Sequence, residues 1–147
     1  IEHVLCATPA YLTEYGVPLQ PEDLRGHSCI YLGETPADAR WKFKQGARSV
    51  TVGVSGRYAA NHTGVRLDAV LQGIGIGSLP YFTARQALEQ GQVVQVLPEW
   101  SFIASYHGGA WLLHAPSRYL PPKIRVFIDF LVERMAQEPT LSTYKIP

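Results

Sequence analysis

The chain has little of several features that mark out large classes of protein. It has two cysteines in 147 residues, a formal net charge of only +1, and no apolar run of the roughly 18 residues that a membrane-spanning helix requires. Its thirteen Lys and Arg residues are scattered singly, so the basic surface of a protein that contacts nucleic acid directly is absent. No signal peptide is visible. These absences predict a cytoplasmic chain that binds neither a membrane nor DNA by itself.

The residues that most often carry chemistry are few and unclustered. Cys6 and Cys29 lie inside apolar runs without any metal-ligand spacing, so we expect buried, reduced thiols, with a disulfide or redox pair as the alternative. No carboxylate pair or Ser/His/Asp set is recognisable from spacing. The sequence therefore predicts no metal site, no cofactor and no enzyme. Five histidines never recur at helical spacing, and each is expected to be a turn or core residue, with His62 as the one that is also a binding candidate: His3, His27, His62, His107 and His114.

What the chain does contain is an apolar fraction of 46% and strands that alternate with helices, which predict a mixed α/β fold around one core. Residues 41–43 and 50–54 alternate apolar with polar or small residues, and Gln45–Arg48 between them predicts a hairpin turn. Residues 111–115 are a further strand-like run. The most periodic helix follows Pro121, with its apolar positions at Ile124, Phe127, Ile128, Leu131 and Met135.

The central stretch, residues 61–80, predicts a helix followed by a strand. Asn61 is the expected N-cap, with Thr63 as the competing choice. Leu67, Val70 and Leu71 fall at i, i+3 and i+4, so they should pack against a core. Two polar residues of this helix are expected to face water: Arg66 and Gln72.

Glycines join this helix to the strand. Gly73 should end the helix in a left-handed conformation, and Pro80 should close the strand and start another helix. The Gly73-x-Gly75-x-Gly77 pattern lacks the strand-then-helix order of a dinucleotide fingerprint. We instead expect small residues that let a buried strand pass close to a helix.

The start of the central helix is the candidate binding site. Asn61, His62 and Thr63 make it polar, and Tyr58 just upstream supplies an aromatic wall. Unpaired backbone N–H groups and the positive end of the helix dipole attract a carboxylate or another anion at such a place. Ordinary helix capping is the alternative, and it is compatible with binding because a cap uses only some of the free N–H groups.

Six motifs, in this order and spacing, resemble the effector-binding domain of LysR-type transcriptional regulators. Each motif alone is weak, but together they cover nearly the whole chain. They lie at residues 6–12, 21–29, 41–43, 64–80, 91–100 and 121–131.

The resemblance implies a fold like the type 2 periplasmic binding proteins, in which two α/β lobes enclose a small-molecule cleft. It also implies a bacterial cytoplasmic regulator that forms homo-oligomers and binds a small organic effector, an acid being one candidate. Effector-contacting groups in this family come from loops and helix starts that face the cleft. The positions of this chain that correspond, and that are carried over as candidates, are Tyr31, Tyr58, Asn61, His62, Thr63 and Ser78.

The chain also departs from the family pattern. The helix-turn-helix through which the family contacts DNA, the linker helix and the first part of the effector domain are missing from it. We expect residues 1–147 to be a partial effector domain, with residues 8–100 forming the second lobe and residues 111–136 returning to the first lobe. Half of the cleft is then absent, and the apolar face of the last helix lacks its usual partner.

The function expected from the sequence is therefore effector sensing that alters the geometry of DNA-binding heads. No catalytic group is needed for such a role, in agreement with the absence of a recognisable active site. A solute-binding protein of the same fold, used for transport, is the first alternative. An enzyme on the same fold is the second.

Overall fold

The computed structural model describes residues 1–106, 108, 109, 111–113 and 120–137. The chain divides into two units: the larger spans residues 2–107, and the smaller comprises residue 1 with residues 108–147.

A four-stranded sheet lies at the centre of the larger unit. It consists of β1 (His3–Ala7), β2 (Cys29–Ile30), β5 (Ile76–Pro80) and β6 (Val94–Val96), in the order β2-β5-β1-β6. β5 runs parallel to β2, whereas β1 is antiparallel to both of its neighbours. β1 and β2, the first two strands of the chain, are therefore separated by β5, which comes from the central stretch of the sequence.

A second sheet contains the predicted hairpin. β3 (Arg40–Gln45) and β4 (Arg48–Gly53) pair in register from Arg40 opposite Gly53 to Gln45 opposite Arg48, and β7 (Ser101–Ile103) pairs with the other edge of β3. Gly46 takes a φ of 58° in the turn, a conformation that glycine adopts without steric cost. The predicted antiparallel pair is confirmed.

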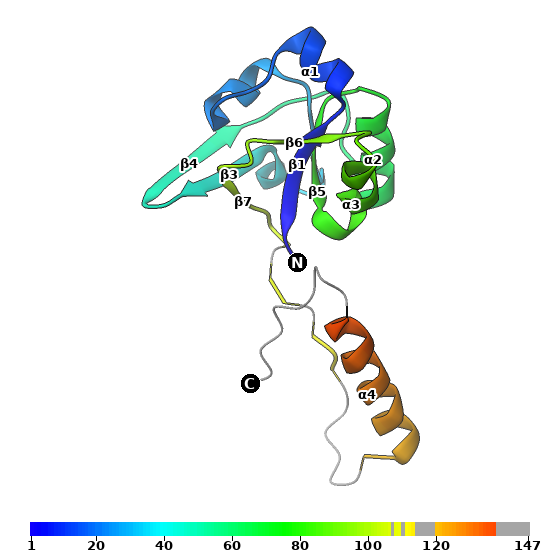
Figure 1. Ribbon diagram of the computed structural model, residues 1–147. Helices are drawn as coiled ribbons and strands as arrows, with labels where there is room; N and C mark the ends of the chain where they lie inside the picture. The colour runs from blue at the N-terminus through cyan, green and yellow to red at the C-terminus, as the bar shows by residue number, and fades with distance from the viewer. Residues whose placement is uncertain (107, 110, 114–119, 138–147) are drawn as a thin grey trace. The chain divides into compact units, whose positions relative to one another are not determined.

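Three helices and two short 3-10 helices complete the larger unit. α2 (Thr63–Leu71) and α3 (Tyr81–Glu89) lie on the same side of the four-stranded sheet (Figure 1). α1 (Pro9–Tyr15) is capped by Thr8, whose hydroxyl accepts a hydrogen bond from Tyr11 N at 3.2 Å. The 3-10 helices are η1 (Pro21–Gly26) and η2 (Pro36–Ala39).

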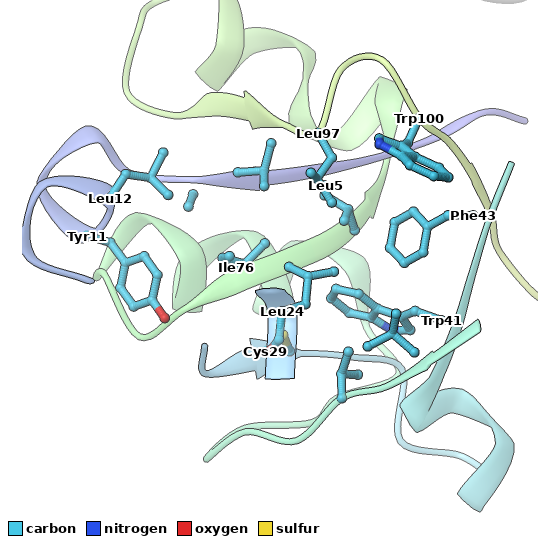
Figure 2. Packing of buried hydrophobic residues seen from close by; sticks show 14 residues of the cluster. Leu5, Tyr11, Leu12, Leu24, Cys29, Trp41, Phe43, Ile76, Leu97 and Trp100 are labelled. Carbon is cyan, nitrogen blue, oxygen red and sulfur yellow. The ribbon is translucent and has the colours of Figure 1, made fainter. Parts of the chain in front are cut away.

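Alternation along β1 separates two cores, one on each face of the central sheet. Val4 and Cys6 pack with α2 and α3, whereas Leu5 and Ala7 face the second sheet, α1 and η1. Figure 2 shows this second cluster, in which Phe43 of β3 lies close to Trp100 and Trp41 of β3 lies close to Leu24. The larger unit is thus built in layers, with the central sheet between the α2/α3 pair and the hairpin sheet.

Glycine shapes the approach of β5 to its neighbours. A Cβ built on Gly77 would lie 2.3 Å from Val70 Cγ2 of α2, and one built on Gly75 would lie 2.1 Å from the carbonyl oxygen of Ser28. Gly73 ends α2 with a φ of 70°. The structure therefore confirms that Gly73 ends the helix and that Gly77 lets the strand pass close to it, whereas Gly75 lies against the Ser28 backbone and not against a helix.

Two predictions about α2 are wrong. The N-cap is His62 rather than Asn61 or Thr63, because the imidazole Nδ1 accepts a hydrogen bond from Val65 N at 3.4 Å. The buried stripe is also displaced by one residue: Arg66 is 4% exposed and is buried with Ala69 and Val70, whereas Leu71 is 37% exposed. Burial of Arg66 is possible because Ser78 of β5 supplies its hydrogen-bond acceptors.

The smaller unit contains the predicted C-terminal helix, α4 (Pro122–Ala136). It begins after Pro121 and carries Pro at its first position, where the missing N–H group has no intrahelical partner anyway. Its large apolar side chains are half-exposed or exposed, among them Ile124, Phe127 and Phe130. Of the predicted strand at residues 111–115, residues 111–113 are not in a strand, and residues 114 and 115 lie outside the described residues.

Candidate functional site

A small polar pocket of about 40 Å³ opens on the larger unit. It lies where α2, β5, η2, β3 and the segment after β7 meet. Trp41 and Phe102 contribute apolar walls. Its polar and charged lining residues include His3, Asp38, Arg40, Arg66, Ser78 and Tyr106.

Arg66 is the central side chain of this pocket. Its Nη1 donates to the Ser78 carbonyl oxygen at 2.8 Å and lies 3.5 Å from Ser78 Oγ. The Nε atom is also buried, but it has no hydrogen-bond partner among the described residues. A buried donor without an acceptor costs about 1–3 kcal/mol. Arg66 is therefore held at one edge of its guanidinium and unsatisfied at another.

The local sequence explains how this arginine is placed. Arg66 N donates to His62 O, so Arg66 belongs to the first hydrogen-bonded turn of α2 and shares a face with Ala69 and Val70. The small Ala69 lets the helix approach the sheet closely. Ser78 is a polar residue in an otherwise apolar strand, and it lies 5% exposed opposite Leu5 of β1. A helix and the strand that follows it thus bring the two polar side chains together.

Burial and the neighbouring charges shift the pKa of Arg66 in opposite directions. Burial lowers the pKa of the Arg66 guanidinium, while Asp38 and Glu34 raise it. Arginine remains protonated throughout because its ordinary pKa is far above neutrality. No carboxylate of the described residues forms an ion pair with it within 4.0 Å. The pocket therefore contains a permanent, partly unpaired cation.

Asp38 is largely committed to the backbone of its own loop. One of its carboxylate oxygens, Oδ2, accepts from Glu34 N at 2.9 Å and from Thr35 N at 2.7 Å, which caps η2. Tyr106 donates its hydroxyl proton to Glu34 Oε2 at 2.8 Å, and this hydrogen bond raises the pKa of Tyr106. The acidic groups at this side of the pocket are therefore fixed by N–H and O–H donors.

The pocket volume limits what it can accept. A drug-sized ligand occupies a cavity of about 300 Å³ or more, whereas a cavity of about 10–15 Å³ is enough for a single water molecule. The pocket therefore accommodates one functional group of a ligand, and the rest of such a ligand has to lie against other surfaces.

Of the six residues predicted from the sequence, Ser78 lines this pocket and the other five do not. The backbone brings Tyr31 to the segment before α2, because Tyr31 forms a β-bridge with Ala59 and its carbonyl oxygen accepts from Ala60 N at 3.1 Å. Tyr58 is 36% exposed.

The predicted helix start is polar and accessible. Asn61 and His62 are exposed, and Thr63 is half-buried at the first position of α2. Thr63 and pocket-lining Arg66 lie three residues apart on one helix, so they share a face. The role of these residues in binding stays a prediction.

Sequence reasoning missed Arg66, Asp38 and Tyr106. The sequence contains one signal for Arg66. It lies three residues before Ala69 and four before Val70, so it shares the face of α2 that is buried. Asp38 and Tyr106 gave no such signal. They reach the pocket through tertiary structure alone.

Cys6 and Cys29 are free, buried thiols, and burial raises the pKa of each to about 12. Within the described ranges, no group of three or more His, Cys, Asp or Glu side chains is arranged to hold a metal ion. Within the same ranges, no helix has the length and apolar character of a membrane span.

Curated relatives of this chain are transcriptional regulators. It is 62% identical over 133 residues to "Probable HTH-type transcriptional regulator LtrA" of Klebsiella pneumoniae, a match that covers 90% of this chain and 43% of the relative. It is 34% identical to the HTH-type transcriptional regulator PtxR of Pseudomonas aeruginosa, over 94% of this chain and 43% of the relative. The chain thus spans less than half the length of these relatives.

Solved structures show the same fold. The full-length Vibrio cholerae virulence activator AphB, a member of the LTTR protein family, matches 90% of this chain and 44% of its own chain with 28% identity and a TM-score of 0.70. The regulatory domain of CrgA from Neisseria meningitidis matches with 24% identity and a TM-score of 0.67 over 90% of this chain and 64% of its own. These structures are, or contain, regulatory domains with the type 2 periplasmic-binding-protein-like fold, as the sequence predicted. The family model of the LysR substrate binding domain matches residues 1–136, and the chain belongs to this family.

Proposed function

We propose that this chain senses a small organic effector, and that in the intact regulator effector binding alters the geometry of attached DNA-binding heads. The observation that carries the proposal is the pocket around Arg66 and Ser78, which presents a buried cation with an unsatisfied donor. A polar group in this position gains more from a ligand than a water-exposed one does, because its desolvation cost is already present without the ligand.

Sensing requires only that the effector bind one conformation more tightly than another. A ligand shifts an equilibrium by its difference in affinity for the two states, and no bond has to be made or broken. We propose on this basis that the chain is a sensor and has no catalytic activity. The curated relatives named above are regulators, which supports the same choice over transport of a solute.

The helix start forms a second part of the proposed binding surface. Since the pocket takes a single functional group, the remainder of the effector needs further contacts. Tyr58 and residues 61–63 lie on the segment that leads into α2, and Tyr31 forms a β-bridge with Ala59 of that segment. Arg66 follows in the first turn of α2. We propose that these residues contact the rest of the effector.

Partners other than the effector are also part of the proposal. DNA would be contacted only through a helix-turn-helix domain elsewhere in the regulator, which would be a cytoplasmic homo-oligomer. The exposed apolar side chains of α4, including Val126, Phe127 and Phe130, support an association of this kind, because large apolar groups on a surface favour burial against a partner.

Screening the chain against a library of small organic metabolites tests the proposal. Isothermal titration calorimetry should identify a ligand whose affinity drops when Ser78 is changed to Ala. Ser49→Ala is the matched control, because Ser49 is exposed on β4 and does not line the pocket. A ligand whose affinity is equally insensitive to both substitutions would place binding elsewhere, and a library without any ligand would count against effector sensing by this chain.

A further inference from the structure

The unsatisfied edge of Arg66 is specific enough to indicate what kind of group it receives. Ser78 fixes the guanidinium through Nη1, and the buried Nε–H is left without an acceptor among the described residues. A guanidinium presents its N–H groups in a rigid plane that matches the two oxygens of a carboxylate. The Nε edge therefore matches an oxyanion in geometry, and because less than 1 Å² of Nε is accessible, an oxyanion reaches it only when the groups that cover it move apart.

We propose that Arg66 is the receptor for a carboxylate of the effector, which makes the effector a small organic acid. This inference rests on the proposed function and names the ligand class of the same pocket. The carboxylate accepts a hydrogen bond from Nε–H and so satisfies the one donor of this side chain that is buried and unpaired. A neutral carbonyl group would satisfy the donor but would leave the buried charge without a counterion.

Size and charge favour a carboxylate over a phosphate or sulfate group. The pocket volume of about 40 Å³ suits a planar group of few atoms. Asp38 lines the same pocket, and Glu34 is close enough to act on the charge of Arg66. Like charges nearby disfavour a second negative charge, so a dianion is repelled more strongly than a carboxylate monoanion.

Ser78 acts as a positioning residue in this arrangement. Its carbonyl oxygen and hydroxyl both contact Arg66 Nη1 and so fix the orientation of the guanidinium. The Nε edge therefore has a defined direction when the ligand binds. Arg40 lines the same pocket but is exposed. Because solvent screens an exposed charge, Arg40 should contribute much less to carboxylate binding than Arg66 does.

The Nε–H group of Arg66 is itself an NMR probe. In wild-type chain labelled with ¹⁵N, titration with acetate should move the Arg66 Nε–Hε cross-peak saturably, whereas acetamide, which has the same shape without the charge, should not. Inorganic phosphate should move it less than acetate does. Through-bond assignment identifies the cross-peak, and its loss in Arg66→Lys confirms the assignment without the titration depending on that variant.

Two variants test the division of roles. Ser78→Ala keeps the 2.8 Å hydrogen bond from Arg66 Nη1 to the carbonyl oxygen of residue 78 and removes only the 3.5 Å contact with the hydroxyl, so it should weaken acetate binding by about three- to fivefold. Arg40→Gln should leave the acetate affinity within about twofold. A matched loss in both variants would show that the pocket attracts anions by net charge and not through the fixed Nε edge, which would overturn the proposal.

The remaining outcomes separate this inference from the proposed function. If acetate and acetamide move the cross-peak equally, or neither moves it, Arg66 is not a carboxylate receptor. A neutral metabolite found in the calorimetric screen would then leave effector sensing intact. If acetate moves the cross-peak but the metabolite library yields no ligand, the carboxylate site stands and the sensing proposal fails.

Discussion

Replacing Gly77 by Ala tests the packing that holds α2, and with it Arg66, against β5. A Cβ at residue 77 would lie 2.3 Å from Val70 Cγ2, more than an ångström inside the 3.4 Å at which ordinary contact begins. Val70 is fully buried and β-branched, so it cannot rotate away easily in a helix. Either Val70 leaves its rotamer or α2 moves outward.

The expected cost follows from these contacts. Overpacking a buried site by one methyl group costs about 1–3 kcal/mol, of which about 0.4–1 kcal/mol is offset because Ala restricts the unfolded chain. We therefore expect Gly77→Ala to lower the free energy of unfolding by about 1–2 kcal/mol. For a chain of this size the melting temperature should fall by about 3–6 °C. Urea denaturation followed by circular dichroism measures the first quantity, and calorimetry measures the second.

A control and a rescue make this prediction sharp. Gly53→Ala on β4 places a Cβ in open space, so its effect should stay within about 0.5 kcal/mol. Val70→Ala alone removes two buried methyl groups and should cost about 1.5–3 kcal/mol. The double variant Val70→Ala/Gly77→Ala should be more stable than the sum of the two single effects by at least about 1 kcal/mol. Simple additivity, or a Gly77→Ala variant as stable as Gly53→Ala, would refute the close helix–strand contact.

Three further predictions concern stability and reactivity. Cys6 and Cys29, whose pKa values burial raises to about 12, should react with a thiol reagent near neutral pH only after the chain is unfolded, and reaction of the native chain would contradict their burial. Burial lowers the pKa of His27 from its ordinary 6.5, so the folded state favours the neutral ring. The contribution of His27 to the free energy of unfolding is therefore complete above pH 6.5 and is lost as the pH falls through the lowered pKa. Unfolding free energies from about pH 7.5 to about pH 5.5 should therefore fall more steeply in wild type than in His27→Asn, and parallel profiles would exclude this role. Arg48 lies 5.0 Å from the Trp100 ring centroid and 3.4 Å from Glu22 Oε1, so Arg48→Gln should cost about 0.5–1 kcal/mol, against no measurable change for exposed Lys44→Gln.

The regular elements were predictable because their signals are local. Alternation at residues 41–43 and 50–54 gave the hairpin, and the turn at Gly46 fixed where it reverses. Helical spacing gave α4, and the glycines gave the end of α2 and its close contact with β5. In each case a few neighbouring residues determine the outcome.

The errors in α2 have one physical cause. Hydrophobicity alone assigns Arg66 to the solvent and Leu71 to the core, whereas the structure buries Arg66 and leaves Leu71 half-exposed. The burial of a guanidinium depends on an acceptor supplied from outside the helix, here Ser78 on β5. Periodicity within one helix cannot contain that information. The choice of His62 over Asn61 as N-cap depends in the same way on backbone conformation.

The pocket itself was largely hidden from the sequence for a related reason. Ser78 was predicted, but its neighbours Asp38, Arg66 and Tyr106 come from separate elements that only the tertiary fold brings together. The family resemblance placed the binding surface at the start of α2, one turn away from Arg66. A polar residue within a buried strand, and an arginine in line with Ala69 and Val70, were the two signals that point to the pocket itself.

Backbone chemical-shift mapping with a library of small organic metabolites tests the central claim most directly. If the chain senses its effector through this pocket, at least one compound should cause saturable shifts in the amides of Asp38, Ser78 and Tyr106 while leaving the β3/β4 turn unchanged. Saturable shifts confined to other surfaces, or none with any compound, would contradict the account.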